Sequence, residues 1–225
     1  MLSKAEGSRI EAEVLAKRRE RLTGEAESGI IKAITIKDIQ NSDTGEVISD
    51  ECKKTIFNTL KAQGAAYIYD EVKVVKIPRD KEGRMELLRT NAISSPGYPK
   101  VILEINEEAF GGKTKAYMDK LIKLQKYSTA NSLEEAVIHE CAHAKVINGK
   151  FYSQYKAIDE ELSGPFFTQP IKGRADKKSL KDLAGEISEY AQKDGLECIA
   201  ESHVKLSRKE YIPEELKILH DQYIE

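Results

Sequence analysis

The chain has 225 residues, of which 33% are charged and 40% hydrophobic, and its formal net charge is −2 at pH 7. This composition is typical of a soluble globular protein with a substantial core, and it excludes a disordered chain. Because the net charge is close to zero, there is no general attraction to nucleic acid or to a membrane surface, and neither is expected as a partner.

Targeting signals and cysteines indicate the compartment. The N-terminus lacks the apolar core of a secretory signal, and the apolar runs are too short to span a bilayer. Three cysteines, Cys52, Cys141 and Cys198, make no disulfide framework and suit a reducing environment. We therefore expect a soluble, cytoplasmic protein.

Charge density separates the start of the chain from the rest. Residues 1–28 combine dense charge with alanine, which predicts a solvated helical extension or linker. Residues 29–225 are expected to form one α+β domain, with strands early and helices late. Alternating β-branched and apolar residues predict strands at 30–36, 66–77 and 101–105. Apolar periodicity, caps and breakers predict helices at 50–63, 114–127, 133–147, 152–162, 179–193, 196–206 and 213–225.

The helix predicted between Ser132 and Gly149 contains H-E-C-A-H at residues 139–143, an H-E-x-x-H motif. Residues four apart lie on one face of a helix, so His139 and His143 can reach one small cation, with Glu140 beside it. The alternative is a pair of half-buried histidines on an amphipathic helix. The unbroken helical setting favours the metal site.

Two histidines need a third protein ligand to form a catalytic zinc site. Glu197 and Glu201 are four residues apart on the next-to-last predicted helix, so one carboxylate can bind metal while the other accepts a hydrogen bond from a ligating imidazole. Alternatively, Asp194-x-x-Glu197 is only a capping box, and Glu201 is a solvated acid.

The segments I-S-E-Y-A at 187–191 and E-C-I-A-E-S at 197–202, which follow an H-E-x-x-H helix, resemble the zincin domain of lethal-factor-type toxins. They are more similar still to the related domains of phage and prophage minor head proteins. The resemblance covers residues 132–206, where Ala142 stands in the place of a glycine in many relatives.

This resemblance implies a zincin-like fold, in which a small, twisted, mostly antiparallel sheet packs on the active-site helix and the C-terminal part is helical. It implies that Glu197 is the third zinc ligand, that Glu201 supports the ligands from behind, and that Tyr190 faces the metal. It also implies that the strand at 101–105 is the edge strand that receives substrate.

The expected activity is that of a zinc metallopeptidase with one Zn²⁺ per chain, a hydrolase that acts on a protein or peptide. Glu140 would act as general base on the attacking water, and Tyr190 would stabilise the oxyanion. Cys141 and Cys198 border the same region, where a thiolate ligand is the alternative to two small core residues.

Two other functions remain open. The first is a phage head or assembly protein that keeps a metal-binding zincin fold with little or no turnover. The second is a toxin-like effector protease domain. The phage resemblance adds phage head proteins as expected partners and virion association as the alternative to the host cytoplasm.

Overall fold

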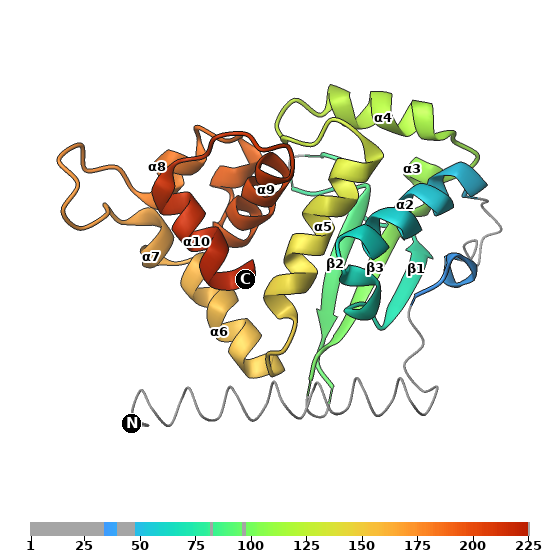
Figure 1. The fold of residues 1–225 in the computed structure, drawn as a ribbon, viewed down its shortest axis with the longest axis horizontal. Helices are drawn as coiled ribbons and strands as arrows, with labels where there is room; N and C mark the ends of the chain where they lie inside the picture. The colour runs from blue at the N-terminus through green and yellow to red at the C-terminus, as the bar shows by residue number, and fades with distance from the viewer. Residues whose placement is uncertain (1–33, 40–47, 82, 96–97, 225) are drawn as a thin grey trace.

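The structure is a computed structural model that describes residues 34–39, 48–81, 83–95 and 98–224. It confirms the α+β class, with one small mixed sheet and helices packed around it (Figure 1). The extension predicted at 1–28 lies outside the described residues. Within the described ranges, no helix is both long enough and apolar enough to cross a membrane.

The strands are β1 (Glu71–Val75), β2 (Leu88–Ile93) and β3 (Lys100–Asn106), in the order β1-β3-β2. β1 pairs with β3 in parallel, and β2 pairs with β3 antiparallel, with Thr90 opposite Leu103. The sheet was expected to be mostly antiparallel, and one of its two strand pairs is antiparallel. The strand at 101–105, expected at the edge, is the central strand, because β2 forms a hairpin with β3 and takes the edge itself.

The helices follow the predicted order with shifted ends. The described ranges contain α2 (Asp50–Ala62), α3 (Glu107–Phe110), α4 (Lys115–Leu124), α5 (Leu133–Ile147), α6 (Tyr152–Leu162), α7 (Pro165–Thr168), α8 (Leu180–Ala184), α9 (Gly195–Ser207) and α10 (Glu214–Ile224). Short 3₁₀ turns are η1 (Ile36–Asp38), η2 (Ala65–Tyr67) and η3 (Tyr190–Gln192).

Three predicted elements differ from the structure. The strand predicted at 66–77 forms only at Glu71–Val75, as β1, after the 3₁₀ turn η2. Residues 34–36 of the strand predicted at 30–36 lead into η1, because the Asp38 carboxylate accepts hydrogen bonds from the Thr35 backbone and hydroxyl at 2.7 and 2.6 Å. Residues 30–33 lie outside the described part. The helix predicted at 179–193 ends early, as α8, and the chain turns at Gly185. A Cβ there would lie 2.6 Å from Gln192 Nε2, so the missing side chain leaves room for the end of Gln192 beside the turn.

Helix α5 lies between the sheet and the C-terminal helices (Figure 1). Its residues Val137, Cys141 and Ala144 belong to a core shared with α2 and the sheet. Val146 belongs to a second core formed with α6, α8, α9 and α10. A helix buried on both sides is held at a fixed height and rotation by packing, so it can place side chains accurately.

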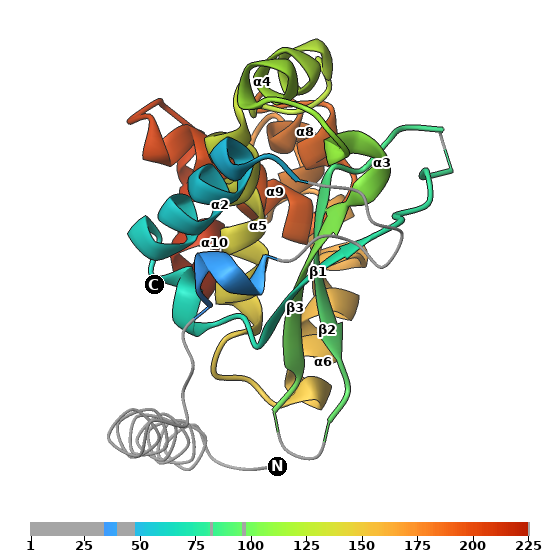
Figure 2. The ribbon, with the colours of Figure 1, turned by 90° about the vertical axis from the view of Figure 1, so that its right-hand side faces the viewer.

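The β2–β3 hairpin extends past the end of β1 toward α6, as Figure 2 shows. At this end, the rings of Tyr98 and Phe151 stack with centroids 5.1 Å apart. At the start of α9, a Cβ on Gly195 would lie 2.9 Å from Leu162 Cβ, so only glycine allows α9 to approach α6 this closely. The first contact attaches the end of the β2–β3 hairpin to the start of α6, and the second brings α9 close to the end of α6.

Candidate metal centre

Helix α5 presents His139 and His143 on one face. The helix starts where Ser132 Oγ accepts a hydrogen bond from the Glu135 backbone at 3.3 Å, and it is followed by Gly149 in the left-handed conformation, with φ of +80°. Both caps are as predicted. The two imidazoles meet with their Nε2 atoms 3.1 Å apart.

Helix α9 adds a carboxylate to the same point. Asp194 caps α9 by accepting a hydrogen bond from the Glu197 backbone at 2.9 Å. The Glu197 side chain points away from this cap, and its Oε2 lies 3.1 Å from His139 Nε2 and 3.4 Å from His143 Nε2. Glu197 therefore takes part in the helix start through its backbone while its side chain faces the histidines.

The three side chains fit a cation. Their ligand atoms all lie within 4.8 Å of one another, and His139 and Glu197 are largely shielded from solvent. In a tetrahedral zinc site with bonds of about 2.0–2.1 Å, neighbouring ligand atoms lie about 3.3 Å apart. The observed separations of 3.1, 3.1 and 3.4 Å agree with that spacing. Two imidazoles and one carboxylate are also the donor set of many catalytic zinc sites.

The electrostatics of the cluster favour a positive charge at its centre. Burial disfavours the charged forms of both His139 and Glu197. The carboxylates of Glu197 and Glu201 nevertheless raise the pKa of His139 well above its usual range. In turn, His143 and His139 hold the pKa of Glu197 well below its usual range. A carboxylate that stays ionised when buried needs a cationic partner, which a bound metal ion would provide.

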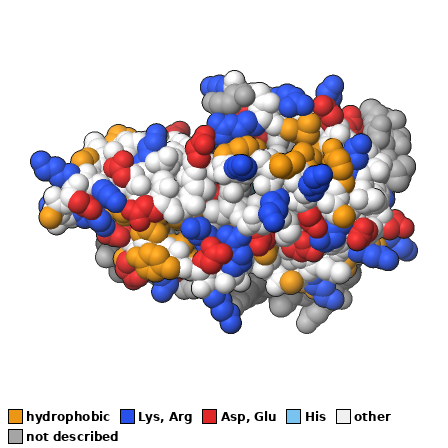
Figure 3. All heavy atoms as spheres, turned by 90° about the horizontal axis from the view of Figure 1, so that it is seen from above, with side chains coloured by type: hydrophobic (Ala, Val, Ile, Leu, Met, Phe, Trp, Pro, Cys, Tyr) orange, Lys and Arg blue, Asp and Glu red, His pale blue; other side chains and the backbone are white. Residues whose placement is uncertain are grey.

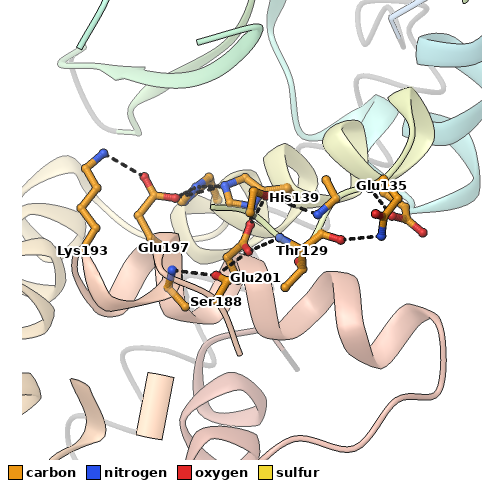
Figure 4. A network of polar contacts seen from close by, with 12 residues as sticks. Thr129, Glu135, His139, Ser188, Lys193, Glu197 and Glu201 are labelled. Carbon is orange, nitrogen blue, oxygen red and sulfur yellow. Dashed lines mark hydrogen bonds and ion pairs between the residues drawn. The ribbon is translucent and has the colours of Figure 1, made fainter. Parts of the chain in front are cut away.

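Glu201 lies behind His139, on the side away from Glu197 (Figure 4). Its side chain is fully buried, and its Oε1 is 3.0 Å from His139 Nδ1. It also accepts hydrogen bonds from the Ser128 hydroxyl at 2.8 Å, the Thr129 backbone at 2.6 Å and the Ser188 hydroxyl at 2.8 Å. Because Glu201 accepts a hydrogen bond from the Nδ1–H of His139, the Nε2 lone pair of His139 is left free to bind a metal.

A cleft of about 200 Å³ opens beside this cluster, and its lining includes His139, His143, Glu197, Glu140 and Tyr190. A smaller, more apolar hollow shares His139, Glu140 and Tyr190 with this cleft. The structure thus brings all the predicted metal, base and oxyanion residues to one depression between the sheet edge and α9. Glu201 is excluded from its lining because it lies behind the histidine.

Tyr190 reaches the cleft from η3. Its ring lies 5.9 Å from the His139 ring, and its backbone donates to Tyr127 O at 2.8 Å. Burial raises the pKa of Tyr190, and the nearby carboxylates of Glu197 and Glu140 raise it further. The phenol therefore keeps its proton at neutral pH and remains a hydrogen-bond donor.

Several contacts of the site were not predicted. Lys193 Nζ lies 3.3 Å from Glu197 Oε1, a contact that the i, i+4 spacing of the two residues could have indicated. Ser128, Thr129 and Ser188 around Glu201 had no separate signal, since serine and threonine are common in loops.

The cysteines near the site are core residues. Cys141 and Cys198 are both fully buried and unpaired, and burial raises the pKa of each thiol to about 12. Neither belongs to the cluster of possible ligands found in the described part of the chain. This agrees with the expectation of small core residues rather than thiolate ligands.

The surface over α4 carries both signs of charge. Figure 3 shows Lys and Arg side chains interspersed with Asp and Glu on this face. Among the described residues seen there, the two signs are not segregated into separate regions.

Comparison with known proteins gives no family for the chain. No protein-family model matches it, no curated protein matches it, and no solved structure matches it.

Proposed function

We infer that the chain is a zinc metallopeptidase of the zincin type. The observation that carries this proposal is the convergence of His139, His143 and Glu197 at one wall of a cleft that Glu140 and Tyr190 also line. The three ligand atoms have the separations of a tetrahedral site, and Glu201 holds one ligand in the correct tautomer. The resemblance of residues 132–206 to zincin domains supports the same assignment.

The residues can divide the chemistry among them. A bound zinc ion would supply Lewis acidity and a water with a pKa lowered toward about 7. Glu140 accepts a proton from the attacking water and passes it to the leaving amine. The Tyr190 hydroxyl donates a hydrogen bond to the oxygen that becomes negative as the carbonyl turns tetrahedral.

The edge of β2 can align an extended peptide. Leu87 O accepts a hydrogen bond from Asn106 at 3.0 Å, so odd-numbered residues of β2 face the central strand. The backbone groups of Leu88, Thr90 and Ala92 consequently point away from the sheet, because the direction of the backbone N–H and C=O groups alternates along a strand. The Thr90 N–H is already bound to Glu140 Oε2, so a substrate strand would pair with the backbone groups of Leu88 and Ala92. Leu88 and Thr90 also line the cleft, so a substrate strand added here would pass the histidines.

The experiment compares the zinc-loaded protein with Glu140→Gln on an unbiased peptide library, with cleavage followed by mass spectrometry. Glu140→Gln is nearly isosteric and should keep its zinc, but hydrolysis should fall by about 10²- to 10⁴-fold, the usual contribution of a positioned base. Identical fragment patterns from the two proteins, or none from the wild type, would exclude the peptidase and leave a metal-binding structural domain. An association with phage head proteins rests on the sequence resemblance and remains a prediction.

A further inference from the structure

Thr90 binds Glu140 at two points. Its backbone N–H donates to Glu140 Oε2 at 2.6 Å, and its hydroxyl donates to the Glu140 carbonyl oxygen at 3.0 Å. One residue of β2 thus holds both the side chain and the main chain of one residue of α5. The distance of 2.6 Å is short for an N–H donor, which indicates a close contact between the strand and the carboxylate.

Tyr69 contacts both Thr90 and Glu140. It lies just before β1 and is 3% exposed, and its hydroxyl donates to the same Glu140 carbonyl at 2.9 Å. It also lies 2.8 Å from Thr90 Oγ1. Burial raises the pKa of Tyr69 well above its usual range, so the phenol keeps its proton and remains a donor. Two of these three contacts thus meet at the Glu140 carbonyl, and the third joins the two hydroxyl groups to each other.

Because this carbonyl lies in the middle of α5, contacts to it orient the helix against the sheet. Glu140 lies in the middle of α5, where its carbonyl already accepts the helical bond from four residues later. Two additional side-chain donors therefore are not needed to satisfy it. They fix the rotation and height of α5 against the sheet at the residue that carries the carboxylate, and the Thr90 amide then fixes the carboxylate itself.

We propose that Tyr69 and Thr90 are positioning residues that hold the Glu140 carboxylate in the orientation needed for proton transfer. Oε2 is held by the strand, whereas Oε1 has no hydrogen-bond partner among the described residues and is left for the attacking water. The proposal rests on the peptidase function proposed above. It adds a role for two residues of the sheet, which lie outside the H-E-x-x-H and E-x-x-A-E segments.

A kinetic comparison tests this role. Tyr69→Phe and Thr90→Val each delete one hydroxyl with little change in shape. Thr90→Ser keeps the hydroxyl and removes only the methyl group. The first two should lower kcat by about tenfold to a hundredfold, the effect of a small misplacement of a reacting group, with KM little changed. Thr90→Ser should stay near wild type, and zinc content should be unchanged in all three. Tyr223→Phe is the control, because it removes the hydroxyl of a buried tyrosine of α10 that is not among the residues lining the cleft.

A second measurement does not depend on turnover. In the protein without substrate, hydrogen exchange of the Thr90 amide should accelerate by at least about tenfold in Glu140→Ala, while the amides of β3 keep their protection. If the wild type is active and both hydroxyl variants keep its kcat, the positioning role is wrong. If the wild type is inactive, the proposed function fails, and the Thr90 amide alone decides whether the contact to Glu140 exists. Unchanged exchange in Glu140→Ala overturns it.

Discussion

Glu201→Gln tests how the buried carboxylate controls His139. In the structure, Oε1 faces His139 Nδ1 and the Ser128 hydroxyl, and Oε2 faces the Thr129 amide and the Ser188 hydroxyl. The Thr129 N–H can only donate, so a glutamine must keep its oxygen there and place its NH₂ group against His139. His139 can then accept only if its proton moves from Nδ1 to Nε2, which is the atom that faces Glu197 and His143.

The size of the effect follows from these contacts. A protonated Nε2 cannot bind a metal, so zinc affinity should fall by about 10- to 100-fold, the usual cost of a lost partner behind a ligating histidine. Hydrogen bonds to a charged group each contribute about 1.5–3 kcal/mol, and glutamine remakes most of them in neutral form. The free energy of unfolding should therefore fall by about 1.5–3 kcal/mol.

Competitive zinc titration against a chelating dye and urea unfolding of the metal-free protein measure the two effects separately. Glu197→Gln is the matched comparison, because it removes a ligand directly and should lose more zinc affinity than Glu201→Gln. The reasoning is refuted if Glu201→Gln binds zinc as tightly as the wild type. The reverse order of losses would show that the two carboxylates have exchanged roles.

Three further outcomes are expected. The pKa of His203 is lowered to about 3 by burial, by Lys145 and by His220. A histidine that folding keeps neutral contributes its full stabilisation of the folded state above its unfolded pKa of about 6.5. This contribution is lost as the pH falls from about 6.5 toward 3. Urea titrations at pH 7 and 5 should therefore show a smaller decline for His203→Gln than for the wild type, and equal declines would contradict this. Gly195→Ala should lower the free energy of unfolding by about 1–3 kcal/mol, because its Cβ would overlap Leu162, and a Tm equal to that of the wild type would show that α6 and α9 are farther apart. A thiol reagent at pH 8 should modify none of the 3 cysteines in the folded protein and all of them in denaturant, since each is fully buried; rapid reaction of any one would contradict its burial.

The residues of the site could be predicted because helical spacing is local. His139 and His143, and likewise Glu197 and Glu201, are four apart, which puts each pair on one helix face whatever the rest of the fold does. The structure adds that the two faces meet, which depends on long-range packing. Spacing alone left Glu197 as a ligand or as part of a helix cap, and the direction of its side chain separates the two.

The sheet was harder to predict because its pairing depends on distant residues. The segment at 101–105 is apolar and β-branched, which indicates a buried strand but not whether it lies in the centre or at the edge. The predicted strand at 66–77 is shorter in the structure, since η2 follows the left-handed Gly64 and β1 begins only at Glu71. Thr90 and Tyr69 could not be found from sequence, because their contacts to Glu140 span 50 and 71 residues.

The zinc content of the purified protein tests the central claim most directly. After reconstitution and removal of free metal, inductively coupled plasma mass spectrometry should find about one zinc per chain. His139→Ala, His143→Ala and Glu197→Ala should each retain far less, while Glu140→Gln, which leaves the three ligands in place, should retain the wild-type amount. A wild-type protein that neither carries zinc nor takes it up would contradict the metal centre and the peptidase function built on it.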